Sequence, residues 1–252
     1  MCNRGGNFAA RKRIFSGTTA MPMTRFYAPI LLIITFCLTM TSCASTCEIF
    51  GSNRNPSFED KTVALVPENN GDFDGSEETI THGTFIMTCT GGAPQLCRIT
   101  VGGDPVGFMV VENGKLDMDL DNDGNATVSG TNLNNKLARY LSKMNAIEFE
   151  LARQDLLYTS ATIFDGDPDG MLHREFQARC RKLLDSRKEL QTEFITSNFD
   201  NVLGKNFFIQ LLDEPPTPER KAQVEQILKK APKNFKGDED IKRFVRQAGY
   251  KL

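Results

Sequence analysis

The 252-residue chain contains no tryptophan and only two histidines, His82 and His173. Neither histidine has a nucleophile or a second ligand close by in the sequence, so a Cys/His catalytic pair or a zinc site lacks its partners. The chain also has no Cys-x-x-Cys, G-x-S-x-G, Walker A or G-x-G-x-x-G motif. These absences argue against thiol-disulfide exchange, serine hydrolysis and motif-based nucleotide binding. We therefore expect a protein that is not an enzyme.

Long apolar runs are also scarce, and the one that stands out covers residues 28–40, with Thr41, Ser42 and Cys43 directly behind it. A run of 13 residues is too short to span a bilayer, which needs about 20 in a helix, but it suits the apolar core of a secretory signal. Small residues followed by a cysteine resemble the lipobox of bacterial lipoproteins, whose cysteine is acylated and becomes the mature N-terminus. We predict lipidation of Cys43; the alternatives are a transmembrane anchor or an ordinary cleaved signal.

Residues 1–42 therefore form a leader and are excluded from the fold. Met21 and Met23 lie just ahead of Arg25, so we expect translation to start at one of them. The leader holds five of the 30 basic residues and none of the 32 acidic ones, which leaves a net charge of −7 on the rest. Such an acidic protein is poorly suited to sequence-independent nucleic-acid binding, which relies on Lys and Arg.

Residues 43–131 have the pattern of an antiparallel β-sheet or sandwich-like domain. Short apolar segments with period-two alternation are separated by Gly, Asn, Asp and Pro. This pattern predicts strands at residues 62–66, 84–88, 96–101, 108–111 and 116–120.

The segment at residues 112–115 predicts a hairpin between the last two of these strands. Asn113-Gly114 is a favoured pair for a type I′ turn, because both central residues need positive φ. In the strand that follows, apolar residues alternate with Asp117 and Asp119, which puts these carboxylates on a solvent face. There they solubilise the protein and have little of the burial that a catalytic carboxylate pair needs.

Residues 132–252 are predicted to be helical. Two helices show apolar stripes at i, i+3 and i+4 spacing, the first from Leu137 to Leu151 and the second from Leu172 to Phe194, with a loop at residues 164–170. A shorter helix is expected at residues 202–212. Thr217 and Pro218 have the types of an N-cap and a first helical residue. Asp238 is expected to cap a last helix, and Gly249 to end it.

Two short motifs carry a resemblance to a known domain. They are VENGK at residues 111–115 and VSGTNLN at residues 128–134, placed after a lipobox and a small β-domain. This order is similar to an uncharacterised lipoprotein domain that commonly precedes a thioredoxin-like or peroxiredoxin-like module in envelope proteins of some Gram-negative bacteria. The resemblance covers about residues 47–215. The thioredoxin module is absent from the sequence, so its redox activity is not implied.

Four cysteines follow the predicted lipidation site: Cys47, Cys89, Cys97 and Cys180. Cys89 and Cys97 flank a turn between two predicted strands, so a cross-strand disulfide between them is one possibility in an exported protein. The alternative is a pair of unbonded, half-buried thiols. Cys180 lies on the apolar stripe of its helix, where we expect a buried small hydrophobe.

Two acidic segments, residues 119–124 and 165–170, imitate the start of a calcium loop, with carboxylates at alternate positions and a glycine at the sixth. An EF-hand closes with a bidentate Glu at the twelfth position, where this chain has Gly130 and Phe176. We interpret both segments as polar turns and expect no metal and no cofactor, with a weak surface calcium site as the alternative.

The sequence thus predicts an α+β protein: a leader at 1–42, a β-domain at 43–131 and a helical region at 132–252. We expect a non-catalytic, lipid-anchored lipoprotein that acts through protein or ligand interaction. The alternatives are an accessory of envelope thiol-disulfide chemistry with a thioredoxin-like partner, and a relic of the longer architecture. Ala44 and Ser45 lack the Asp that would suggest inner-membrane retention, which favours the outer membrane of a Gram-negative bacterium.

Overall fold

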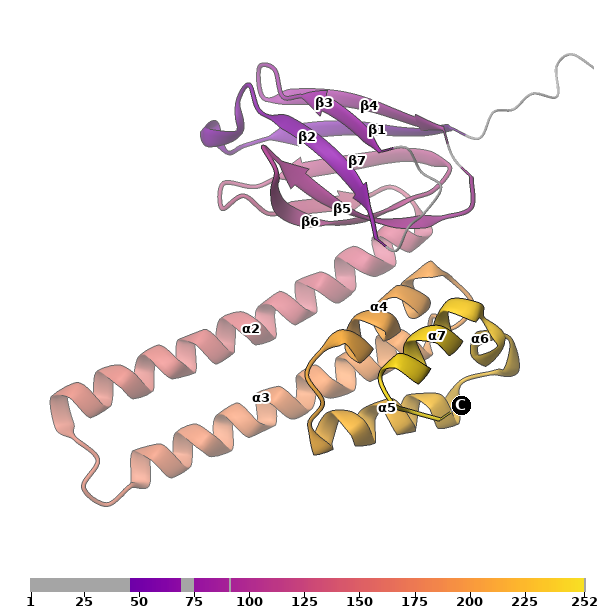
Figure 1. Ribbon diagram of the computed structural model, residues 1–252. Helices are drawn as coiled ribbons and strands as arrows, with labels where there is room; N and C mark the ends of the chain where they lie inside the picture. The colour runs from indigo at the N-terminus through magenta and orange to yellow at the C-terminus, as the bar shows by residue number, and fades with distance from the viewer. Residues whose placement is uncertain (1–45, 69–74, 91, 252) are drawn as a thin grey trace, which may run out of the picture. The chain divides into compact units, whose positions relative to one another are not determined.

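The computed structural model describes residues 46–68, 75–90 and 92–251 (Figure 1). The predicted leader and Cys43 lie outside these residues. Strands occupy residues 46–129 and helices follow over residues 132–247, so the predicted α+β class, with a sheet region before a helical region, is confirmed. None of the described helices is both long and apolar enough to cross a membrane.

The described strands form two four-stranded sheets. In spatial order the first sheet contains β4 (Thr84–Thr90), β1 (Thr46–Asn53), β7 (Gly114–Leu120) and β8 (Ala126–Ser129). The second contains β3 (Ser76–Thr79), β2 (Thr62–Pro67), β5 (Gln95–Val101) and β6 (Asp104–Val111). Neighbouring strands are antiparallel except β1 and β7, which are parallel. The predicted antiparallel pattern is therefore interrupted once.

The two sheets enclose a hydrophobic core, as in a β-sandwich. Alternate residues of β1, β2, β4 and β7 are buried; in β4 these are Phe85, Met87 and Cys89, with exposed residues between them. In β7 the apolar residues are buried, and Asp117 lies on the outer face as predicted. The largest buried side chains come from both sheets and include Ile49, Met87, Leu116, Met118, Leu65, Ile99 and Met109.

The predicted hairpin at residues 112–115 is wrong. β6 pairs with β5, whereas β7 pairs with β1 and β8, so this segment carries the chain from one sheet to the other. Gly114 has a φ of 134°, but Asn113 is not among the non-glycine residues with positive φ, so no type I′ turn forms. The physical reason is that β7 finds a full-length partner in β1, which the sequence pattern does not reveal.

The helical region begins with two long helices, α2 (Asn132–Asp165) and α3 (Met171–Thr196), which run antiparallel as a hairpin (Figure 1). Four shorter helices follow in the described chain: α4 (Val202–Asp213), α5 (Pro218–Lys230), α6 (Lys233–Gly237) and α7 (Glu239–Gln247). The predicted caps are confirmed. The Thr217 side chain accepts a hydrogen bond from the Arg220 N–H, Asp238 accepts from two N–H groups of α7, and Gly249 has a φ of 78°. Only α6 was not predicted.

A second hydrophobic core joins the helices. It is built from Leu137 and Tyr140 of α2, the end of α3, and buried residues of α4, α5, α6 and α7. Two sandwich residues, Leu96 and Val110, belong to the same core. The strands and the helices are therefore packed together through these side chains.

Candidate functional site

The distal hairpin is the most unusual surface that the structure describes. We use this name for residues 145–189, which comprise the far end of α2, the connecting loop and the start of α3. Both hydrophobic cores lie elsewhere, since Met144 and Leu190 are the last members of the helical core on either side of this segment. The distal hairpin is thus held mainly by contacts between its own two helices.

Those contacts include aromatic and polar side chains of both helices. The Tyr158 ring stacks on the Phe176 ring with centroids 4.6 Å apart, and the Tyr158 hydroxyl lies 3.2 Å from Nδ1 of His173. The Asp167 carboxylate accepts hydrogen bonds from the N–H groups of Leu172 and His173, which caps the start of α3. Cys180 is half-buried, so it is less buried than predicted. Nε2 of His173 lies 2.9 Å from the side-chain nitrogen of Gln177.

Several large apolar side chains of the same helices are exposed. Phe149, Leu156 and Ile163 of α2 are 72%, 67% and 72% exposed and lie seven residues apart. We call these three residues the apolar stripe of α2. Seven-residue spacing keeps side chains on one face of a helix and is the repeat of a coiled-coil seam. Of the large hydrophobic side chains that are exposed in the described chain, six of nine lie on the distal hairpin.

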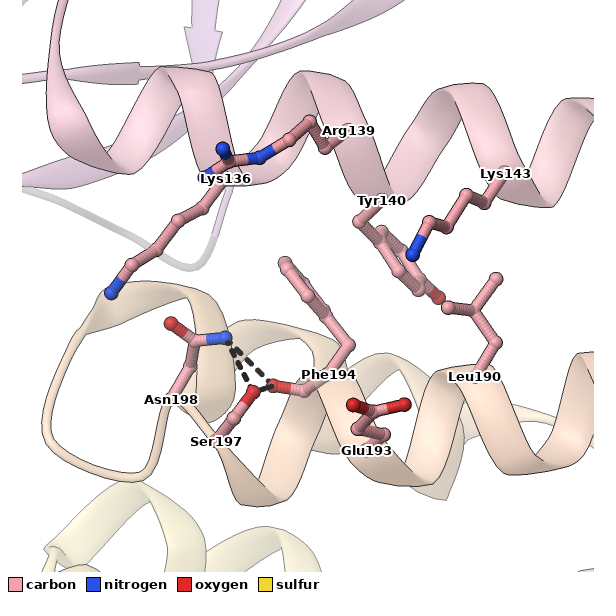
Figure 2. Close-up of a pocket in the computed structure, with 9 residues that line it drawn as sticks. All are labelled: Lys136, Arg139, Tyr140, Lys143, Leu190, Glu193, Phe194, Ser197 and Asn198. Carbon is pink, nitrogen blue, oxygen red and sulfur yellow. Dashed lines mark hydrogen bonds between the residues drawn. The ribbon is translucent and has the colours of Figure 1, made fainter.

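A different feature, a cleft of about 340 Å³, lies between the start of α2 and the end of α3 (Figure 2). Three cationic residues of α2, Lys136, Arg139 and Lys143, line it at i, i+3 and i+7 spacing, and Glu193 of α3 lies opposite. The other lining residues are Tyr140, Leu190, Phe194, Ser197 and Asn198.

The floor of the cleft is aromatic. Tyr140 stacks on Phe194 with ring centroids 3.9 Å apart and 9° between the planes, and Phe207 packs edge-on against both. Burial raises the pKa of Tyr140 to about 12, so its phenol stays neutral at ordinary pH. Ser197 donates its hydroxyl hydrogen to the Phe194 carbonyl and accepts a hydrogen bond from Nδ2 of Asn198. The cleft therefore combines stacked aromatic rings with a row of cationic side chains from α2.

The structure separates the two cysteines that the sequence placed on neighbouring strands. Cys89 lies in β4 of one sheet and Cys97 in β5 of the other, so the expected cross-strand arrangement is wrong. Both are buried free thiols, and a disulfide between them stays a prediction. Sequence reasoning missed Cys47, which is the register partner of Cys89 in β1. The alternation of Cys47, Ile49 and Gly51 was the available signal for β1.

The two acidic segments serve as turns and caps. Asp119 forms an ion pair with Arg54 on the sheet surface. Asp121 accepts hydrogen bonds from the N–H groups of Asp123 and Asn125, as polar turn residues do. Within the described chain, no group of three or more His, Cys, Asp and Glu side chains is arranged to hold a metal ion.

Comparison of the chain with protein-family models finds no match, and comparison with curated proteins finds none either. The resemblance of residues 47–215 to a lipoprotein domain that precedes thioredoxin-like modules therefore stays a prediction.

Proposed function

We propose that this chain is a non-catalytic, lipid-anchored lipoprotein of the cell envelope that binds another protein through the distal hairpin. The observation that carries this proposal is the apolar stripe of α2. Exposed large apolar side chains that gather on one part of a protein are typical of an interaction site, and six of the nine in the described chain lie on the distal hairpin. The seven-residue spacing favours a partner that supplies an apolar helix, because a second helix can follow such a stripe over several turns.

The sequence supports the location. The apolar run at residues 28–40 and the small residues before Cys43 are typical of a lipoprotein signal, and a lipid on Cys43 would hold the protein at a membrane. The outer membrane of a Gram-negative bacterium is the preferred site, since Ala44 and Ser45 follow the predicted lipidated cysteine. Attachment to a membrane would bring the distal hairpin to partners of the same compartment.

The test is chemical crosslinking in intact cells, followed by capture of the chain and mass spectrometry of what is captured with it. We expect wild type to recover a specific protein, and the double variant Leu156→Ser/Ile163→Ser to lose it. Burying two such side chains is worth about 3 kcal/mol or more, so affinity should fall at least 100-fold. Because both residues are exposed, the variant should keep the thermal stability of wild type.

The matched control is Arg181→Ser/Lys182→Ser, which changes two exposed polar residues of α3 in the same hairpin. It should recover the same protein as wild type. Recovery of identical partners by the stripe variant would overturn the proposed binding surface. A Cys43→Ala variant tests the anchor separately, because it should leave the membrane fraction whether or not the stripe binds.

A second candidate function is an accessory role in thiol-disulfide chemistry for a separate thioredoxin-like protein. It draws on three buried cysteines of the sandwich, Cys47, Cys89 and Cys97. Recovery of a thioredoxin-like protein by wild type, and its loss in a Cys89→Ser/Cys97→Ser variant, would favour this role. This role has less support than binding through the distal hairpin. All three thiols are buried, whereas an exchange partner must reach the sulfur atom.

A further inference from the structure

Two cysteines face each other at the start of the sandwich. Cys47 of β1 and Cys89 of β4 are register partners in an antiparallel pair, and their side chains are 0% and 2% exposed. Directly opposed residues of antiparallel strands have Cα atoms about 4.5 or 5.5 Å apart, depending on the pair type. Disulfides join Cα atoms about 4.4 to 6.8 Å apart. The backbone therefore already has the spacing that a disulfide needs.

The two thiols are also in contact. A hydrogen bond between them raises the pKa of Cys47 and lowers that of Cys89, because the Cys47 S–H donates to the Cys89 sulfur. The N–H of Glu112 is directed at the Cys47 sulfur and the Ser76 side chain at that of Cys89. Both side chains therefore point into the same space.

Cys97 is a third thiol of this core but differs in its surroundings. It lies in β5, on the opposite sheet, and is fully buried. Burial raises the pKa of Cys97 to about 12, and the charge of Cys89 acts in the same direction. Cys97 is therefore less reactive than Cys89, because the thiolate is the form that attacks a disulfide.

We propose that Cys47 and Cys89 form a structural disulfide while Cys97 remains a thiol beside it. This inference goes beyond the proposed function. It rests on the proposed envelope location only because that compartment supplies the oxidant, which is a disulfide-bearing compound or protein. While the chain folds and before the core buries these residues, the Cys89 thiolate attacks one sulfur of that disulfide and releases a thiolate, and Cys47 then attacks the mixed disulfide and releases the second. Two cysteine thiols become one disulfide, while the oxidant gains two electrons and two protons as two thiols.

The bond would fasten the first residues of β1, four positions after the predicted lipid attachment site, to the edge strand β4. Tension from the anchor would then act on a covalent link as well as on the hydrogen bonds of β1. A disulfide buried in this core is also shielded from exchange, which suits a structural bond.

The first test uses the full chain isolated from membranes, with thiols trapped by acid and alkylation before denaturation. Fragmentation of non-reduced peptides should show Cys47 linked to Cys89. Cys97→Ser should keep this bond, and so should the matched control Cys180→Ser in α3. A bond between Cys89 and Cys97 in wild type, or loss of the disulfide in Cys97→Ser, would overturn the inference.

The second test unfolds the reduced, purified protein and refolds it in the presence of oxidised glutathione, so that the thiols are accessible before the core forms. The same disulfide should form, and the midpoint of thermal unfolding should rise by about 10 °C relative to the reduced protein. Absence of the bond under these conditions would overturn the inference. If the Cys47–Cys89 disulfide forms with glutathione but not in cells, the pairing is supported and the envelope location is contradicted. The two proposals can therefore fail separately.

Discussion

Gly51 makes room for an aromatic ring inside the sandwich. It is buried in β1 directly opposite Phe85 of β4, and a Cβ added to it would lie 2.1 Å from a ring atom of Phe85. A buried ring cannot move aside without disturbing the core, so overpacking is costly here. We expect Gly51→Ala to lower the free energy of unfolding by about 1 to 3 kcal/mol, measured by urea denaturation.

Gly92→Ala is the matched control for this substitution. No atom lies within 4 Å of a Cβ added at Gly92, and its φ is not in the left-handed region. Its unfolding midpoint should equal that of wild type or exceed it slightly. Adding Phe85→Leu to Gly51→Ala should recover part of the lost stability, and no recovery would argue against a clash with the ring.

Among the elements, helices were far easier to predict than strand partners. The helix caps at Thr217 and Asp238 are determined by neighbouring residues, so the sequence shows them directly. Strand pairing depends on residues far apart in the chain, as when β1 pairs with both β4 and β7. The predicted hairpin at residues 112–115 failed for this reason, since a good turn sequence says nothing about which sheet its strands join.

The sequence alone predicts only part of the candidate site. Phe149, Leu156 and Ile163 can be read off at seven-residue spacing, but α2 carries a second apolar stripe that includes Ile147 and Leu151. Only the position of α3 decides which stripe is covered. The sequence therefore predicts an apolar helix, and the structure identifies the face that is left exposed.

Two elements of the helical region are joined by ion pairs. Lys205 of α4 lies 3.0 Å from Asp238 and 2.7 Å from Asp240, at the start of α7. Burial acts to lower the pKa of Lys205, but its hydrogen bonds to the two carboxylates outweigh this and raise it. The hydrogen bond from Lys205 also lowers the pKa of Asp240. Both shifts mean that folding favours the charged forms.

Lys205→Met should therefore destabilise the protein in a pH-dependent way. The lowered pKa of Asp240 gives stability that is present above its ordinary pKa, near 4, and lost as pH falls through the lowered value. The raised pKa of Lys205 gives stability that is lost only above about pH 10.4. The side chains are about one-third exposed, so screening limits the loss to about 0.5 to 1 kcal/mol at pH 7.

Urea midpoints of wild type and Lys205→Met, measured at pH 7 and near pH 3, check this. The difference should shrink at the lower pH, and an equal difference at both would exclude the ion pairs as its cause. Lys242→Met is the control, because Lys242 pairs with Glu239 only within α7. It should change stability by a few tenths of a kcal/mol.

On the scale of the whole molecule, Asn134 connects the helices to the sandwich through hydrogen bonds. Its side chain is buried at the start of α2, where Nδ2 donates to the Val110 carbonyl at 2.8 Å and Oδ1 accepts from the Val110 N–H at 2.9 Å. The amide thus pairs with the edge strand β6 as a neighbouring strand would. Val110 also belongs to the helical core, so polar and apolar contacts between the two regions meet at one residue.

Asn134→Ala should loosen both regions together. It leaves the buried N–H and carbonyl of Val110 without this partner, which should cost about 2 to 4 kcal/mol of unfolding free energy. Hydrogen–deuterium exchange should then become faster in β6 and in α4, because the two regions share one core and open cooperatively. Asn132→Ala, at the exposed first residue of α2, should leave both rates unchanged. Faster exchange in β6 alone would show that the sandwich and the helices unfold as independent units.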